Sequence, residues 1–180
     1  MKVCFLLIAS AALVSSLHGQ NKGAPADMAT DLKQQYAGGK TKIIAAAEQM
    51  PEAGYSFQPT PEERNFGQWV GHVADEQAAW CGAVSGNVKQ LNGASKTSKT
   101  DLIAVLKESF DICDAVYEGT TMPNRDEPVP TFRGPRPRAS WLYFNMAHNE
   151  ECYGNMAVYL RLQKLIPPSS QPRGGPAKGK

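Results

Sequence analysis

Two histidines and one cysteine are the side chains of this sequence whose types and spacing best suit metal chemistry. His148 and Cys152 lie four residues apart in a segment with helical periodicity, so their side chains project from the same face, one above the other. This spacing lets one helix offer two ligands to a single ion. His72 lies in another helical segment, about 100° away from the centre of its apolar stripe. We therefore expect His72 to face a cleft between helices that is open to water on one side.

Three carboxylates are candidates for acid–base work at such a site. Glu76 shares the direction of His72, and Glu151 lies at the edge of the face that carries His148. Together with Asp75, they are the candidates for a proton acceptor or for groups that orient the ligands. A structural interpretation competes, because a buried histidine is more often a satisfied core residue and a lone buried cysteine usually only packs. The sequence shows no Gly-rich phosphate loop and no evident nucleophile–base–acid set.

Four segments with helical periodicity must position these side chains. They are expected at residues 28–50, 61–85, 98–119 and 138–165. Gly38 and Gly39 weaken the first segment and favour a bend there. In the second segment Thr60 is the expected N-cap, Pro61 fits the first helical position, and Glu63 completes a capping box.

The connections between these segments are rich in turn-forming residues. Residues 86–99 predict a long crossover loop between the second and third helices, and residues 120–137, with five prolines, predict an ordered loop. We expect the arginines of this second loop to be solvated, with the alternative that some line a site for an anionic ligand: Arg125, Arg133, Arg136 and Arg138. Pro167–Pro168 should stop the last helix. With no strand pattern, the sequence predicts an all-α four-helix bundle without a sheet over residues 28–168.

The two ends of the chain differ from this domain. Lys2, the apolar run of residues 5–17 and the small and polar residues after it predict a cleavable signal peptide over residues 1–19. The run is shorter than the roughly 20 apolar residues that span a bilayer, and an anchored N-terminal helix is the alternative. A periplasmic or secreted protein is expected, with no membrane partner after cleavage. Residues 169–180, rich in Pro, Gly, Lys and Arg, predict a disordered tail.

Charge and cysteine content narrow the partners further. The 19 basic and 17 acidic residues interleave, and no basic stripe carries aromatic residues, so nucleic acid is not expected as a partner. Three cysteines follow the signal peptide, and an odd number in an oxidising compartment leaves at least one thiol or metal ligand unpaired. Cys81 can pack in the core or pair with Cys113, and we favour packing. Cys152 is expected to lie outside any disulfide.

Two stretches of the sequence resemble a known family. Residues 55–61 and 66–75, which include FGQWVGHVAD, resemble the DinB-like superfamily of bacterial four-helix bundles. The segment FNMAHNEECYGN at residues 144–155, followed by Tyr-Leu-Arg at residues 159–161, is similar to the last helix of that family. The resemblance extends over residues 31–168, and it implies the four-helix fold for nearly the whole domain.

The resemblance also implies a divalent metal held by three histidines, one from the second helix and two from the fourth. His72 and His148 match two of these positions, whereas the third is Cys152. Cysteine suits zinc in particular, so a His-His-Cys site is reasonable, with nickel, manganese or iron as other candidates. The substitution equally allows a site that has weakened or lost its metal. Glu151 could then swing in as a substitute ligand.

Members of similar proteins include thiol-dependent S-transferases and isomerases. Three protein ligands leave one coordination position open, as in catalytic zinc sites, so the resemblance implies a metal-dependent thiol transferase acting on a small molecule or thiol. A hydrolase is the other enzyme expected, because the protein is expected to be exported. Export complicates the transferase, because cytosolic thiol cofactors are scarce outside the inner membrane. The alternative is a non-catalytic ligand-binding or interaction bundle with a decayed metal site. The sequence leaves a homodimer open.

Overall fold

The computed structural model describes residues 27–172, and the predicted signal peptide and residues 173–180 lie outside this range. The described part contains four α-helices: α1 (Met28–Gln49), α2 (Phe66–Ser85), α3 (Lys99–Glu118) and α4 (Arg138–Leu162). Three short 3-10 turns, η1 (Glu52–Ser56), η2 (Gly93–Ser95) and η3 (Pro168–Ser170), lie in the connections. These elements form the expected all-α bundle.

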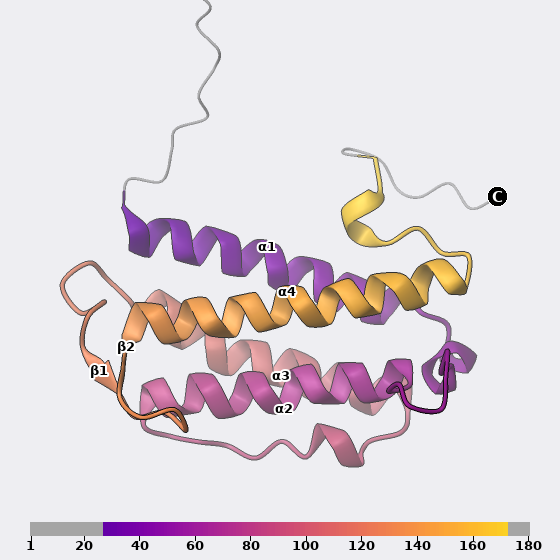
Figure 1. The fold of residues 1–180 in the computed structure, drawn as a ribbon, viewed down its shortest axis with the longest axis horizontal. Helices are drawn as coiled ribbons and strands as arrows, with labels where there is room; N and C mark the ends of the chain where they lie inside the picture. The colour runs from indigo at the N-terminus through magenta and orange to yellow at the C-terminus, as the bar shows by residue number, and fades with distance from the viewer. Residues whose placement is uncertain (1–26, 173–180) are drawn as a thin grey trace, which may run out of the picture.

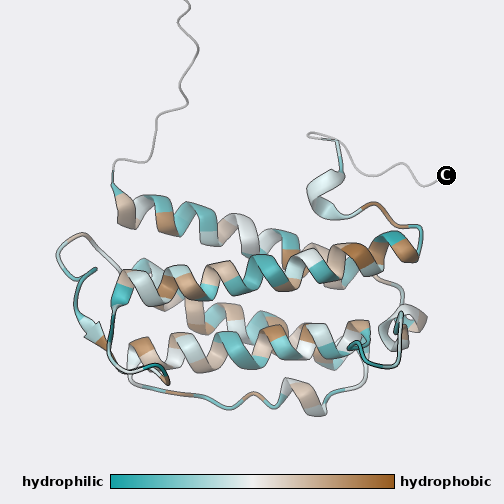
Figure 2. Cartoon of the chain, viewed as in Figure 1, coloured by the Kyte–Doolittle hydropathy of each residue, from teal (hydrophilic) through white to brown (hydrophobic). Residues whose placement is uncertain are grey.

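The four helices form one bundle in which α1 packs against α4 and α2 against α3 (Figure 1). Contacts between α2 and α4 join these two pairs. Figure 2 shows apolar and polar residues alternating along each helix, which is the pattern of amphipathic helices around a shared core. None of the helices in residues 27–172 is long and apolar enough to cross a membrane.

The beginning of α2 differs from the prediction. The helix begins at Phe66, and its capping box is formed by Asn65 and Gln68, each of which hydrogen-bonds the backbone N–H of the other at 2.8 Å. Residues 60–64 form turns instead of helix. In these turns the side-chain amide of Gln58 donates to the carbonyls of Pro61 and Glu63, and Asn65, not Thr60, caps the helix. The predicted Thr60 capping box was therefore wrong.

The end of α4 also differs from the prediction. The helix ends at Leu162, and Lys164 adopts a left-handed conformation with φ 60°. Leu165 N–H then donates to the carbonyl of Leu160 at 2.8 Å, which is a helix-terminating arrangement. The chain has thus left the helix before Pro167 is reached, so the prolines are not what stops it. By contrast, α1 continues through Gly38 and Gly39.

Residues just after α4 are ordered against the bundle. The backbone N–H of Ser169 donates to the hydroxyl of Tyr153 at 2.8 Å, and the side chain of Gln171 reaches that of Gln49. The predicted disordered tail was therefore wrong for residues 169–171, because polar groups of α1 and α4 offer them hydrogen-bond partners. The remainder of that prediction lies outside the described residues.

The loop between α3 and α4 is closed by a minimal sheet, which the sequence did not predict. The strands β1 (Pro128–Val129) and β2 (Arg136–Pro137) pair antiparallel, with Val129 opposite Arg136. Arg138 N–H also donates to the carbonyl of Glu127 at 2.9 Å, next to this pair. The pair holds together the two ends of the turn at residues 130–135.

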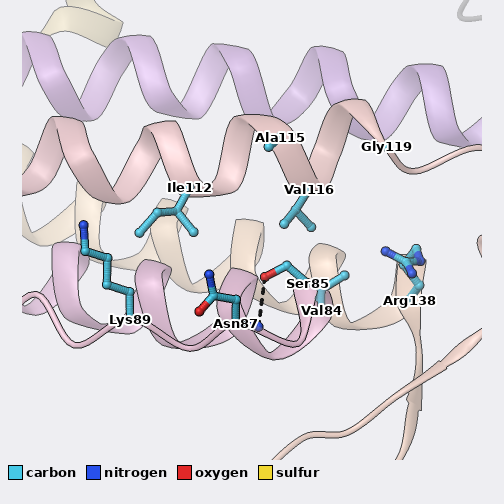
Figure 3. Close-up of a pocket in the computed structure, with 9 residues that line it drawn as sticks. All are labelled: Val84, Ser85, Asn87, Lys89, Ile112, Ala115, Val116, Gly119 and Arg138. Atoms are coloured by element: carbon cyan, nitrogen blue, oxygen red, sulfur yellow. Dashed lines mark hydrogen bonds between the residues drawn. The ribbon is translucent and has the colours of Figure 1, made fainter.

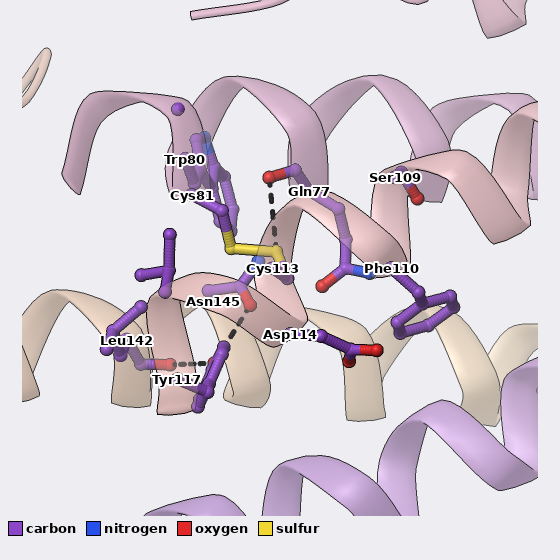
Figure 4. The surroundings of a disulfide bond; sticks show 12 residues. Gln77, Trp80, Cys81, Ser109, Phe110, Cys113, Asp114, Tyr117, Leu142 and Asn145 are labelled. Atoms are coloured by element: carbon purple, nitrogen blue, oxygen red, sulfur yellow. Dashed lines mark hydrogen bonds between the residues drawn. A yellow bond between two sulfur atoms is a disulfide. The ribbon is translucent and has the colours of Figure 1, made fainter. Parts of the chain in front are cut away.

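A disulfide joins α2 to α3. Cys81 and Cys113 are both completely buried, and their Cα atoms lie 5.2 Å apart, within the range that a disulfide requires (Figure 4). The preference for packing over pairing was therefore wrong. Helical periodicity places each cysteine on a face of its own helix, but only the packing of the two helices decides the distance between them.

Candidate metal centre

The structure brings together the three residues that the sequence proposed as ligands. His72 extends from α2, and His148 and Cys152 extend from α4. Their ligand atoms all lie within 4.8 Å of one another. The two Nε2 atoms are 3.2 Å apart, and Cys152 Sγ lies 3.6 Å from His148 Nε2. Residues that are 76 positions apart along the chain thus meet at one point between two helices.

A buried pair of amides fixes the register in which these two helices meet. Asn149, which directly follows His148, donates from Nδ2 to Oε1 of Gln77 at 2.8 Å, and both side chains are almost completely buried. A shift of either helix would break this bond and leave two amides unpaired in the core. Neither amide was predicted from the sequence to belong to the site. The sequence pattern that could have indicated them is the presence of two polar residues, Gln77 and Asn149, at helical positions that face the core.

The crossover loop holds α2 from the opposite side, and it accounts for Asp75. The carboxylate of Asp75 accepts the backbone N–H groups of Gly93 at 2.6 Å and Ala94 at 2.9 Å. It therefore anchors the η2 turn and does not line the cavity beside the histidines. Of the three carboxylates proposed for acid–base work, only Glu76 and Glu151 line that cavity.

The electrostatic setting keeps all three candidate ligands neutral when no ion is bound. Burial lowers the pKa of His72 and that of His148 below the usual value of 6.5, and a charge on His72 lowers that of His148 further. Burial, with a contribution from Glu151, raises the pKa of the Cys152 thiol to about 12. Neutral imidazoles are ready to bind a metal, whereas the thiol would have to lose its proton on coordination.

The donor set suits a tetrahedral ion. Zinc bonds of about 2.0–2.1 Å to nitrogen and about 2.3 Å to sulfur place two nitrogen ligands about 3.3 Å apart and nitrogen and sulfur about 3.5 Å apart. The separations of 3.2 Å between the imidazole nitrogens and 3.6 Å between Cys152 Sγ and His148 Nε2 agree with these values. The three ligand atoms together lie within 4.8 Å of one another, so the side chains would draw closer together to hold one such ion.

His72 and His148 border a cavity of about 390 Å³, whereas Cys152 is not among its lining residues. Glu76 lies on one side of it, with Oε1 4.0 Å from Nδ1 of His72, and Glu151 is exposed at its edge. Trp80 forms another wall, and its ring lies edge-on to that of His148 with 4.7 Å between centroids. The remaining wall comes from α4 and the loop before it: Phe132, Arg133 and Phe144.

Another cavity lies away from this centre. It measures about 490 Å³ and lies between the C-terminal parts of α2 and α3, where Ser85, Ile112 and Val116 line it (Figure 3). None of the three candidate ligands borders it. The cavity beside His72 and His148 is therefore the one that combines ligand atoms with carboxylates.

The fold and the His-His-Cys group define a class of protein: a helical bundle with a group that could hold a metal between its second and fourth helices. A model of the DinB superfamily matches residues 35–154, two thirds of the chain. The chain belongs to the DinB superfamily.

Solved structures agree with this assignment. A DinB-like protein from Bacillus cereus ATCC 10987 is 14% identical, with a TM-score of 0.67 over 76% of this chain and 93% of that one. A DinB-like protein from Bacillus subtilis is 19% identical, with a TM-score of 0.63 over 79% of this chain and 99% of that one. At these identities the likeness concerns the fold. A comparison with curated proteins found no match.

Proposed function

We propose that this protein is a metal-dependent enzyme, a hydrolase or a thiol transferase, with zinc held by His72, His148 and Cys152. The observation that carries the proposal is the donor geometry: the separation of the two imidazole nitrogens and that of Cys152 Sγ from His148 Nε2 suit tetrahedral ligands, and the two histidines border a cavity. Three protein donors leave one position for a water or a substrate atom, which is the arrangement of catalytic zinc.

The residues around the cavity have separate tasks in this proposal. A bound zinc ion would lower the pKa of a water or thiol that reaches it. Glu76 lies 4.0 Å from His72 Nδ1, where it can orient the ring and accept a proton from a group in the cavity. Glu151 borders the same cavity and is the other candidate proton acceptor. The bond between Asn149 and Gln77 holds the two helices in register and so keeps the ligands together.

We propose a periplasmic or secreted location, which favours hydrolysis over transfer to a cytosolic thiol. The Cys81–Cys113 disulfide supports this proposal, because disulfides persist mainly in oxidising compartments. The disulfide is a separate argument from the signal peptide expected over residues 1–19. The substrate would then be a small molecule.

Metal stoichiometry of three proteins tests the proposal. Wild type, purified without chelator or nickel column, should contain about one metal ion per chain, and Cys152→Ala should lose most of it, because two neutral imidazoles hold a divalent ion poorly. Cys152→His should retain the metal, since an imidazole at the same position also projects into the group. Unfolding curves for all three proteins would show that the fold is retained.

The second candidate function is a non-catalytic ligand-binding bundle with a decayed metal site. The observation in its favour is the buried Cys152, which stands at the third ligand position and whose thiol keeps its proton in the absence of an ion. In this case wild type would carry no metal, Cys152→Ala would change nothing, and Cys152→His would create metal affinity. That set of results would rule out the proposed metal-dependent enzyme.

A further inference from the structure

We propose that the cavity beside the His-His-Cys group binds a small aromatic molecule that carries a carboxylate, and that Arg133 anchors this carboxylate. The inference rests on the proposed function only for the other end of the ligand, which would face the metal position. It names a substrate class for the site and a residue of the loop between α3 and α4 that determines specificity.

Arg133 is held in place without its hydrogen-bonding capacity being used. Its guanidinium carbon lies 4.5 Å from the ring centroid of Phe144 and 5.4 Å from that of Phe132. Stacking occupies the faces of the guanidinium plane and leaves the N–H donors at its edge free. Within residues 27–172 no carboxylate forms an ion pair with Arg133, whereas Arg125 pairs with Asp126 and Arg138 with Glu127.

The turn that carries Arg133 is built rigidly. The Thr131 hydroxyl donates to the carbonyl of Gly134 and accepts the backbone N–H of Arg133, and Gly134 adopts φ +82°, which glycine tolerates best. The pairing of β1 with β2 closes the base of the turn. These bonds hold the backbone of the turn, and the contacts with Phe132 and Phe144 keep the exposed Arg133 side chain at the edge of the cavity.

Aromatic rings connect Arg133 to the metal position. Phe132 is 69% exposed, yet its ring lies 5.4 Å from that of Trp141 and 6.4 Å from that of Trp80. Trp80 in turn lies 4.7 Å from His148. A cavity of about 390 Å³ with such a wall has room for one aromatic ring, at the small end of the range for ligand sites.

The carboxylates of the cavity determine which end of the ligand goes where. Glu76 lies next to His72, and neither Glu76 nor Glu151 forms an ion pair with Arg133. Negative charge on the ligand is thus repelled from the carboxylates and attracted by the guanidinium. The anionic end of a ligand should lie at Arg133, with its uncharged reactive group directed toward His72 and His148.

Three probes separate ring from charge: phenylacetate has both, phenylacetamide has only the ring, and acetate only the charge. Calorimetric titration of wild type should give phenylacetate about tenfold tighter binding than either of the others, as expected for one charge-assisted hydrogen-bonded pair. Arg133→Ala should abolish the preference for phenylacetate over phenylacetamide. Arg136→Ala, an exposed arginine of β2 that does not line the cavity, is the matched control and should preserve it.

Equal affinity of wild type for phenylacetate and phenylacetamide would overturn the inference, as would an unchanged preference in Arg133→Ala. The titrations are run on both chelator-treated and zinc-treated protein, because the arginine needs no metal to bind a carboxylate. If wild type holds no metal but the Arg133-dependent preference remains, the proposed enzyme fails and the binding inference stands. If wild type holds metal but shows no preference for phenylacetate that depends on Arg133, the proposed enzyme stands and the binding inference fails.

Discussion

Cys152 is the residue at which this chain departs from the three-histidine set that its family resemblance implies. Its side chain is only 1% exposed and lies between α2 and α4, next to His148. Burial of a thiol favours its protonated form, so the site would exchange a proton for a metal ion. A cysteine ligand would therefore add a negative charge that a third histidine would not, and its separation of 3.6 Å from His148 Nε2 suits a tetrahedral ion.

Lowering the pH should destabilise the metal-free protein. Burial lowers the pKa of His72 and His148 below 6.5, so below about pH 6.5 the unfolded chain binds more protons than the native one. The free energy of unfolding should therefore be unaffected by these residues above pH 6.5 and should fall as the pH drops through and below that value. Urea unfolding of chelator-treated protein between pH 7.5 and pH 5 measures this.

His148→Gln is the control for this prediction. It removes the imidazole whose pKa is lowered both by burial and by His72, so the loss of stability on acidification should be clearly smaller. An equal loss in wild type and variant would show that His148 does not cause the effect.

At the scale of elements, α2 joins the site to the rest of the bundle. It carries His72 and Glu76, it contacts α3 and α4, and its Gly71 touches the crossover loop. A Cβ on Gly71 would lie 2.6 Å from the carbonyl oxygen of Gly93. The absence of a side chain at Gly71 is what lets the loop pack onto α2, where Asp75 binds its backbone.

Gly71→Ala should lower the free energy of unfolding by about 1–3 kcal/mol, because backbone atoms must move to admit the methyl group. Gly38→Ala is the matched control: nothing lies within 4 Å of its added Cβ, so it should raise stability by about 0.5–1 kcal/mol through helix propensity. Chemical denaturation of both variants gives the comparison. A Gly71→Ala protein as stable as wild type would show that the loop is not held against α2.

For the whole molecule, the disulfide is the feature that constrains the unfolded chain. It joins Cys81 to Cys113 across 32 residues, a loop that includes the entire connection between α2 and α3. Closing a loop of this length in the unfolded state stabilises the fold by about 3–4 kcal/mol in the chain-entropy model. Because a reducing compartment would break this bond, the free energy of unfolding depends on the redox state of the compartment.

Equilibrium unfolding in urea with and without a phosphine reductant should differ by roughly this amount. Alkylation of the denatured, unreduced protein should label Cys152, and label Cys81 and Cys113 only after reduction. A Cys81→Ala/Cys113→Ala variant should be insensitive to the reductant. If wild type is equally insensitive, or if a Cys152-linked peptide is recovered, the pairing is different from the one described.

Local sequence patterns determined the helices of this protein and the identity of its candidate ligands. The period of apolar residues predicted α1 and α3 almost to the residue, since each helix has one apolar face whatever it packs against. The family resemblance singled out His72, His148 and Cys152, which the structure places together. The helix predictions and the pairing of His148 with Cys152 depend on the spacing of residues within one helix, which can be read directly from the sequence.

Only the tertiary structure decided the features that depend on distances between elements. The start of α2 was mispredicted: Asn65 caps the helix, and residues before it form turns to which the side chain of Gln58 donates. The Cys81–Cys113 bond depends on how closely two helices approach. The placing of Arg133 against Phe144 depends on a turn whose residues have no periodicity. Such contacts join residues far apart in the chain, and their geometry follows from packing of the whole bundle, which no local pattern records.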